Sequence, residues 1–229
     1  MPPSPLESEL LRRFVTRVEP FVHGAFWLDV LLPRAADELI DESDFDEDER
    51  LPYWADLWPS ARALARRLLD GPAPAGRVLE LGCGVALPSL ALLSRGADVL
   101  ATDYYDDALR FARVNAERNG LPALAARLVD WRDLPPDLGR FDTVLAADVL
   151  YEQRNAEALA AVLPRVTAPG GSALIADPGR VYRSLFEERM AAQGWTVAEV
   201  EARDEHSPGV GAGVTSRIRM LLATPPDAD

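Results

Sequence analysis

The stretch VLELGCGVALPSL, Val78 to Leu90, indicates the fold class of this chain. A short apolar run ends in Glu80, two glycines flank the only cysteine, Cys83, and an apolar helical pattern follows. A glycine-rich turn between a buried strand and a helix lets a ligand approach the backbone closely. The stretch therefore predicts a strand–turn–helix unit that binds a cofactor, and the residues around it must show which one.

Strand and helix patterns alternate from about Tyr53 to the end of the chain. The sequence predicts helices at 61–70, 85–96, 106–120, 155–166 and 181–194, and strands at 77–81, 98–105, 125–131, 141–150, 171–178, 195–202 and 214–223. Alternation at this spacing predicts a doubly wound α/β fold with a mostly parallel, seven-stranded sheet. Only a loop at 204–213 separates the last two strands, so we expect the last strand to be antiparallel.

The first fifty residues differ from this pattern and are expected to form an N-terminal extension. Short β-like runs at 15–33 are interrupted by Pro20, Gly24 and Pro33. The segment DESDFDEDE at 41–49 then holds seven acids in nine residues. Such a run is too charged to pack, so it predicts a solvated loop or a lip that attracts a cationic substrate. We expect residues 1–50 as the extension and 51–229 as the cofactor-binding domain.

Composition and charge limit the kinds of molecule that this chain is expected to bind. The formal net charge is −13, and all 24 basic residues are arginine. This balance disfavours nucleic acid and anionic membranes, and no apolar run approaches the ~20 residues that span a bilayer. One cysteine and two histidines exclude an internal disulfide and a Cys/His zinc site, so no metal is expected. We expect a cytoplasmic protein whose partner is a protein, possibly basic, or a small-molecule amine.

The glycine-rich turn matches phosphate ligands poorly. The dinucleotide fingerprint needs a third glycine where this chain has Leu87, and the charge of Glu80 would repel a pyrophosphate. A Walker motif would need a lysine, and the chain has none. S-adenosylmethionine carries a sulfonium and an ammonium but no phosphate. Gly82 and Gly84 would admit its methionine part, and Glu80 would favour its ammonium.

The ends of the next two strands supply further contacts for this cofactor. Asp103 lies 21 residues after Gly82, beside Tyr104, where a carboxylate can accept from both ribose hydroxyls. Asp130 can accept from the adenine amino group, and Trp131 offers a flat apolar face. Because the carboxyl ends of parallel strands meet at one edge of the sheet, we expect these residues to form one site.

These segments resemble the successive motifs of the class I, seven-strand methyltransferases. The resemblance covers 53–223 and is carried by LELGCG, ATDYY, VDW and FDTVLAADVLYE. The lead-in at 53–69 and DVLY at 148–151 are similar to the branch containing many protein lysine methyltransferases. DPGR at 177–180 is similar to the lysine methyltransferases of the electron-transfer flavoprotein β subunit. The resemblance implies S-adenosylmethionine as cofactor, lined by Trp58, Gly82, Cys83, Gly84, Asp103, Trp131 and Ala147.

The resemblance also implies that Asp148 and Tyr151 face the methyl acceptor. A lysine amine has a pKa near ~10.4 and must be neutral to accept a methyl group. A carboxylate such as Asp148 stabilises the ammonium form, so we expect it to capture and orient the lysine rather than to lower its pKa. Tyr53, Trp54 and Tyr151 would desolvate the amine. Arg180 would either grip an acidic group of the substrate or cap nearby carbonyls.

Other functions of the same fold stay open. A small-molecule amine or hydroxyl could be the acceptor, because loops build the acceptor pocket. A non-catalytic module that binds S-adenosylmethionine is a further alternative, against which Asp148 and Tyr151 weigh. A nicotinamide-dependent oxidoreductase is disfavoured by Leu87 and Glu80.

Overall fold

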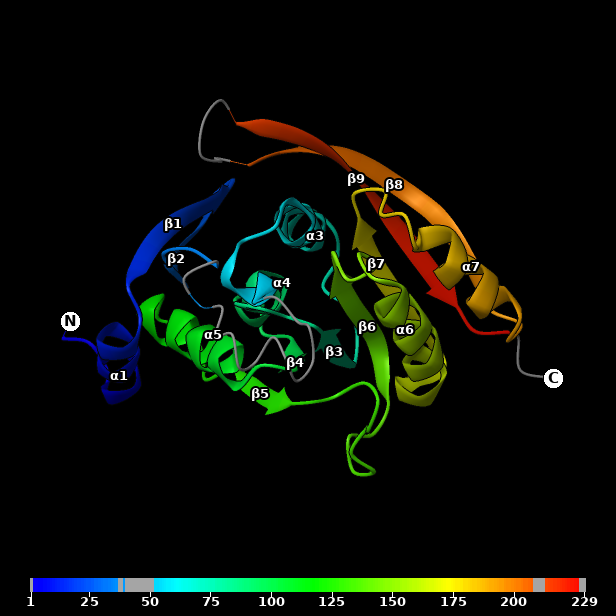
Figure 1. Cartoon of the computed structure of the whole chain (residues 1–229), viewed down its shortest axis with the longest axis horizontal. Coiled ribbons are helices and arrows are strands. Elements are labelled where there is room, and N and C mark those ends of the chain that lie inside the picture. The colour runs from blue at the N-terminus through cyan, green and yellow to red at the C-terminus, as the bar shows by residue number, and fades with distance from the viewer. Residues whose placement is uncertain (1, 37–38, 40–51, 208–212, 227–229) are drawn as a thin grey trace.

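The architecture is a seven-stranded sheet between two layers of helices, preceded by a helix and a hairpin (Figure 1). We describe it from a computed structural model, which describes residues 2–36, 39, 52–207 and 213–226. The acidic run at 41–49 lies outside the described residues. The strands of the large sheet are β3 (Arg77–Leu81), β4 (Asp98–Asp103), β5 (Ala125–Leu128), β6 (Phe141–Ala147), β7 (Thr167–Asp177), β8 (Thr196–Ser207) and β9 (Val214–Thr224).

The strand order β5-β4-β3-β6-β7-β9-β8 is that of a doubly wound sheet. Neighbouring strands from β5 to β7 are parallel, whereas β9 is antiparallel to both β7 and β8. The predicted class, including the antiparallel last strand, is confirmed. The order changes direction between β3 and β6, and ligands of such sheets bind outside the strand ends at this point.

Helices cover both faces of the sheet and divide the core into two apolar clusters. On one face, α3 (Pro59–Asp70), α4 (Leu87–Leu93) and α5 (Asp106–Arg118) share a cluster. On the other, α6 (Gln153–Val166) and α7 (Arg183–Ala191) share the second cluster (Figure 1). Both faces of β3 are therefore buried from Val78 to Leu81, which explains why three of its five residues are apolar.

Several strands end earlier than the sequence predicted. The strands β4, β5 and β6 stop at Asp103, Leu128 and Ala147, so the polar residues that follow them lie in loops. By contrast, β8 continues to Ser207, because its ladder with β9 pairs His206 with Thr215. The prediction of a loop from residue 204 onward was therefore wrong for 204–207.

The N-terminal residues form regular elements that the sequence pattern indicated only in part. Helix α1 (Pro5–Arg13) was not predicted, although Ser4 caps it by accepting a hydrogen bond from the backbone of Glu7. The strands β1 (Thr16–His23) and β2 (Phe26–Pro33) form an antiparallel hairpin. Pro20 does not interrupt β1, because an edge strand tolerates a missing N–H donor.

Two asparagines, one in α5 and one directly after it, hold this hairpin against the large domain. The Asn115 carboxamide accepts from the N–H of Leu31 at 2.7 Å and donates to its carbonyl at 3.1 Å. Asn119, one turn later, makes the same pair of bonds to Asp29 at 2.8 and 3.1 Å. The free edge of β2 is thus satisfied by side chains. Phe21 and Leu10 join the same apolar cluster as α3, α4 and α5.

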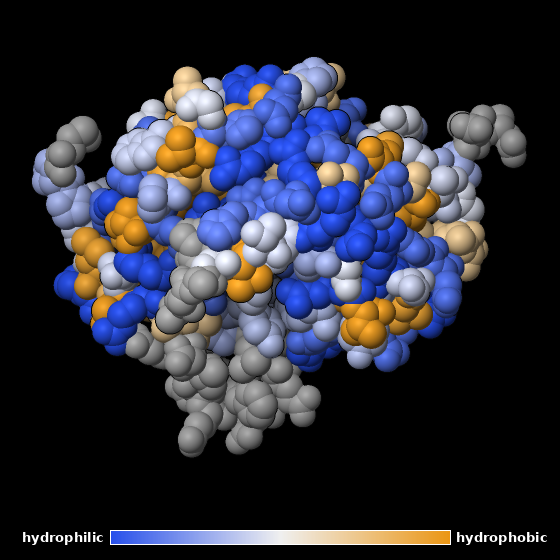
Figure 2. All heavy atoms as spheres, turned by 90° about the horizontal axis from the view of Figure 1, so that it is seen from above, coloured by the Kyte–Doolittle hydropathy of each residue, from blue (hydrophilic) through white to orange (hydrophobic). Residues whose placement is uncertain are grey.

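Ion pairs cover the side of the molecule where α3 meets β8. Arg66 pairs with Glu205, and Arg203 pairs with Asp70. Figure 2 shows the top of the molecule in the view of Figure 1 as largely hydrophilic, with separate apolar groups. No helix in the described part of the chain is long and apolar enough to cross a membrane.

Candidate active site

A cavity opens beyond the carboxyl ends of β3, β4 and β6, at the point where the strand order changes direction. It brings together most of the predicted site residues, from five separate segments of the chain. Arg180 is not among the described residues that line it. The predicted residues that do line it are Tyr53, Trp54, Trp58, Glu80, Gly82, Cys83, Gly84, Asp103, Tyr104, Asp130, Trp131, Ala147, Asp148 and Tyr151.

The turn after β3 needs its glycines for two physical reasons. Gly82 and Gly84 have φ values of 64° and 53°, which L-residues with side chains rarely adopt. A Cβ added to Gly84 would also lie 3.3 Å from the carbonyl oxygen of Trp54. One added to Gly82 would lie 3.3 Å from Val149. The turn therefore presents bare backbone to the cavity.

The sequence analysis expected Glu80 to be a charged group at the mouth of the turn, but the structure places it differently. Its side chain is buried and accepts hydrogen bonds from the N–H of Ser89, at 3.0 Å, and from the Ser89 hydroxyl. Burial raises the pKa of Glu80 to about 8, although the bonds from Ser89 act in the opposite direction. The carboxyl therefore carries a proton at neutral pH until a cation reaches it.

Asp103 lies where the sequence predicted a ribose-binding carboxylate. It is buried, with one oxygen accepting from the N–H of Gly84 at 2.8 Å and the other from the N–H of Tyr105 at 3.0 Å. Each carboxylate oxygen can accept a second hydrogen bond. Asp103 thus links the glycine turn to the end of β4.

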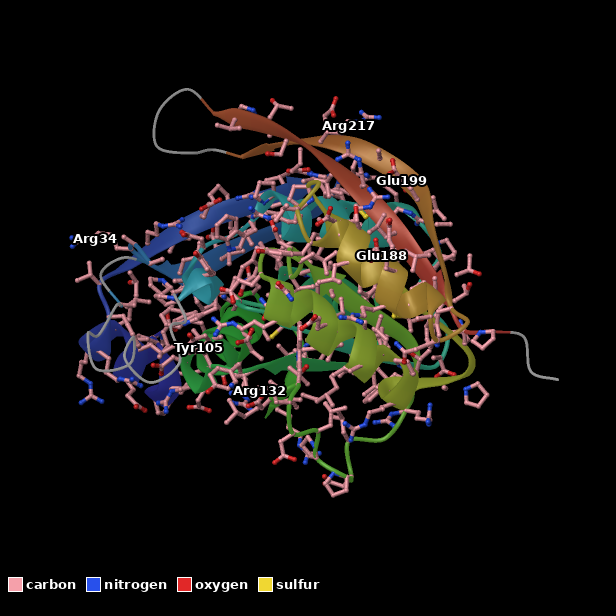
Figure 3. All side chains as sticks on the ribbon, turned by 45° about the vertical axis from the view of Figure 1, so that its right-hand side comes forward. Arg34, Tyr105, Arg132, Glu188, Glu199 and Arg217 are labelled. Atoms are coloured by element: carbon pink, nitrogen blue, oxygen red, sulfur yellow. The ribbon has the colours of Figure 1, made fainter. Side chains whose placement is uncertain are left out.

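Asp130 has a partner that the sequence analysis missed. Both of its oxygens accept from Arg132, through Nε at 3.0 Å and through a terminal nitrogen at 2.7 Å. The Arg132 guanidinium carbon lies 5.6 Å from the ring centroid of Tyr104. Figure 3 shows Arg132 and Tyr105, which follow the neighbouring strands β5 and β4, on the same side of the molecule. An adenine amino group would share Asp130 with this arginine.

Asp148, which lines the cavity, is fixed by three contacts. Its backbone has a positive φ of 59°, and its N–H donates to the Ala176 carbonyl of β7 at 2.9 Å. One carboxylate oxygen accepts from Nε of Arg180 at 2.7 Å and the other from the hydroxyl of Ser60 at 3.1 Å. Ser60 was not predicted. Arg180, expected to contact substrate, is bound to Asp148 instead.

Three aromatic rings surround the approach to Asp148. The ring centroid of Tyr53 lies 5.1 Å from that of Tyr151 and 6.0 Å from that of Trp58. The Trp58 indole donates to the carbonyl of Tyr53 at 2.7 Å, which holds the lead-in segment in place. Trp54 faces Phe111 instead, with a centroid distance of 5.6 Å, so much of its surface is used in packing.

Comparisons with known proteins agree with this geometry. Residues 78–171 match the family model described as "Methyltransferase domain". Similar curated proteins include the electron transfer flavoprotein beta subunit lysine methyltransferases of Xenopus laevis (36% identity; 58% of this chain, 55% of that one) and Danio rerio (38%; 56% and 51%). Histone-arginine methyltransferase METTL23 of Homo sapiens is 32% identical over 47% of this chain and 60% of its own length.

The chain spans about half the length of the flavoprotein-subunit methyltransferases it matches. Among solved structures, the glycopeptide N-methyltransferase MtfA complexed with S-adenosyl-L-methionine has a TM-score of 0.54 at 18% identity. That match covers 73% of this chain and 93% of that one, and at this identity it shows the fold.

The chemistry of the cavity fits S-adenosylmethionine. Backbone from two glycines, the carboxyls of Glu80 and Asp103, and the ring of Trp131 meet there, and the turn itself carries no cationic side chain for a phosphate. Residues 78–171 of the chain thus match a methyltransferase domain, and the chain is similar to curated protein lysine methyltransferases over about half of their length.

Proposed function

We propose that this chain transfers a methyl group from S-adenosylmethionine to a lysine amine of a protein substrate. The observation that carries the proposal is the arrangement of one cavity. Its glycine turn and Asp103 suit the cofactor, and Asp148 lies at its other end among Tyr53, Trp58 and Tyr151. A cofactor site and a polar acceptor site with aromatic walls thus share one enclosure.

We assign the cofactor to the residues that connect β3, β4 and β5. Gly82 and Gly84 would hold its methionine part, Asp103 its ribose hydroxyls and Trp131 its adenine. When bound, the cofactor supplies an electrophilic methyl group on a sulfonium. Glu80 would meet its ammonium, and a positive charge beside the buried carboxyl favours loss of the proton that burial retains.

The residues at the acceptor end would aim a neutral amine. Tyr53 and Tyr151 exclude water from it, and desolvation disfavours its charged form. The lone pair of the amine nitrogen forms the new C–N bond. The amine would take the methyl group that the bound cofactor supplies, the electron pair of the old bond would stay with the sulfur, and the methylated amine would release its proton to water. Asp148 would orient the amine, and alignment of this kind accounts for a large part of such barriers.

A protein acceptor is supported by the names of the relatives. Two are named for lysine in the electron transfer flavoprotein beta subunit, and one for histone arginine. We therefore propose the flavoprotein β subunit as the first acceptor to test and the cytoplasm as the compartment. The two activities named for these three relatives share a protein substrate, and the lysine is the finer part of the proposal.

Methyl transfer from labelled S-adenosylmethionine into a cell lysate tests the proposal. This chain contains no lysine, so methyl-lysine recovered from the reaction comes from a substrate or from the lysate's own enzymes, which a reaction without this protein measures. We expect added label in protein-bound methyl-lysine, and at least about a tenfold lower rate with Asp148→Asn, equivalent to ~1.4 kcal/mol. Label found only in small molecules, or no transfer at all, would contradict a protein acceptor.

A further inference from the structure

Arg180 is held behind the acceptor end of the cavity, not in its wall. Its Nε donates to Asp148 at 2.7 Å, yet Arg180 is not among the described residues that line the cavity, whereas Asp148 is. The Asp148 side chain is 4% exposed and that of Arg180 is 34% exposed. The hydrogen bond to the Asp148 carboxylate is therefore the contact through which we expect Arg180 to act on an acceptor in the cavity.

The backbone before Arg180 is built to place this side chain. Asp177, fully buried at the end of β7, accepts from the N–H of Gly179 at 2.7 Å and from that of Arg180 at 3.1 Å. Gly179 has a φ of 96°, and an added Cβ would lie 2.9 Å from a guanidinium nitrogen of Arg219. The Arg180 guanidinium carbon also lies 5.8 Å from the Trp58 ring centroid. A turn, a glycine and an aromatic ring together fix it.

The ion pair with Arg180 changes how the Asp148 carboxylate interacts with an amine. A lone carboxylate binds a lysine as its ammonium, which cannot accept a methyl group. In this protein each Asp148 oxygen already accepts from a donor, and the negative charge is matched by a guanidinium. Burial acts against the charged form of Arg180, but the bond to Asp148 and its charge outweigh it and raise the pKa of Arg180.

We propose that Arg180 is a positioning residue that neutralises and orients Asp148, so that the acceptor amine binds as the free base. The inference rests on the proposed lysine methyltransferase function and deepens it. The paired carboxylate can still accept a hydrogen bond from a neutral amine, which directs the nitrogen lone pair away from Asp148. Without Arg180, the bare carboxylate would retain the proton on the amine.

Other ionisable groups lie around the pair or line the same cavity, and they act equally in wild type and in each variant. They come from the lead-in segment, the glycine turn, the ends of β4 and β5, the loop after β6 with the start of α6, the end of β7 and helix α7: Tyr53, Asp56, Glu80, Cys83, Asp103, Tyr104, Tyr105, Asp130, Arg132, Tyr151, Glu152, Arg154, Asp177 and Arg183. A difference between the pH profiles of wild type and an Arg180 variant therefore reports the charge of Arg180.

The test is the pH profile of kcat/KM, with the electron transfer flavoprotein β subunit as probe acceptor, or the protein that takes the label in the lysate. Arg180→Gln removes the charge. We expect its rate to fall at least about tenfold at pH 7, and the loss to shrink as pH rises toward ~10, because an opposite charge at this range shifts a pKa by about 1–3 units. Arg180→Lys keeps the charge. Its kcat/KM should therefore fall on the acidic side of the profile at the same pH as that of the wild type.

Two further variants separate charge from orientation. Ser60→Ala removes the other donor to Asp148 without changing charge, so its rate should fall without a shift of the acid limb. In an Asp148→Asn background, Arg180→Gln should add no pH-dependent loss, because coupled residues are not additive. Calorimetric binding of S-adenosylhomocysteine confirms that each variant is folded.

The outcomes are distinct for the two proposals. If wild type methylates no lysine, the proposed function fails and the role of Arg180 falls with it. If wild type is active but Arg180→Gln loses the same factor at every pH, the charge role of Arg180 is overturned and only packing remains. If the rate losses of Arg180→Gln and Asp148→Asn add in the double variant, the charge role of Arg180 is also overturned.

Discussion

Replacing Glu80 with glutamine should change how the stability of this protein depends on pH. Glu80 is 1% exposed, and burial raises its pKa from 4.5 to about 8. Below pH ~4.5 the carboxyl is protonated in both the folded and the unfolded chain. Between ~4.5 and ~8 only the unfolded chain releases this proton, so the free energy of unfolding falls as pH rises. Above ~8 both states are ionised and the loss is complete.

The magnitude follows from the two pKa values. Each pKa unit corresponds to about 1.36 kcal/mol, so the rise from 4.5 to about 8 corresponds to about 5 kcal/mol in full. At pH 7 the loss is about 3 kcal/mol. Glutamine cannot ionise, and its oxygen can still accept from Ser89. Between pH ~4.5 and 7, the free energy of unfolding of Glu80→Gln should therefore rise by about 3 kcal/mol relative to that of wild type.

Urea unfolding at several pH values between 5 and 8, at constant ionic strength and without cofactor, measures this difference. Glu188→Gln is the matched control, because it removes the same charge from an exposed position on α7 (Figure 3). We expect Glu188→Gln to follow the wild-type pH dependence. Parallel curves for wild type and Glu80→Gln would refute the reasoning, since they would show that folding does not retain the Glu80 proton.

The remaining predictions concern the cofactor and the acidic run. Asp103→Asn should weaken S-adenosylmethionine binding at least about tenfold by calorimetry, because bonds to a charged acceptor contribute about 1.5–3 kcal/mol each; unchanged affinity would place the ribose elsewhere. Gly84→Ala and Gly96→Ala both strain a positive φ, but only the former should lose cofactor affinity, since Gly96 has open space around it. Neutralising four acids within 41–49 should lower kcat/KM most at low salt; equal rates at low and moderate salt would contradict a steering role.

The sequence predicted the elements that depend on local pattern. The run of strands and helices from β3 to β9 followed from the spacing of apolar residues and from glycines that need a positive φ, as at Gly82 and Gly84. The meeting of most predicted site residues in one cavity followed too, because a parallel sheet brings its carboxyl strand ends to one edge. Helix α1 was not predicted from the sequence, although Ser4 and Pro5 form a recognisable helix start signal.

The tertiary structure decided which side chains meet. Arg180 and Ser60 both bond to Asp148, although they lie 32 and 88 positions from it in the chain. Likewise Glu80 faces Ser89 rather than solvent, which reverses its expected charge state. The sequence presented Asp148 as a free carboxylate and Arg180 as a separate substrate contact, because local periodicity carries no information about how two loops approach each other. Only the packing of β6, β7 and α3 brings these groups within hydrogen-bonding distance, and that distance determines the charge an acceptor amine encounters.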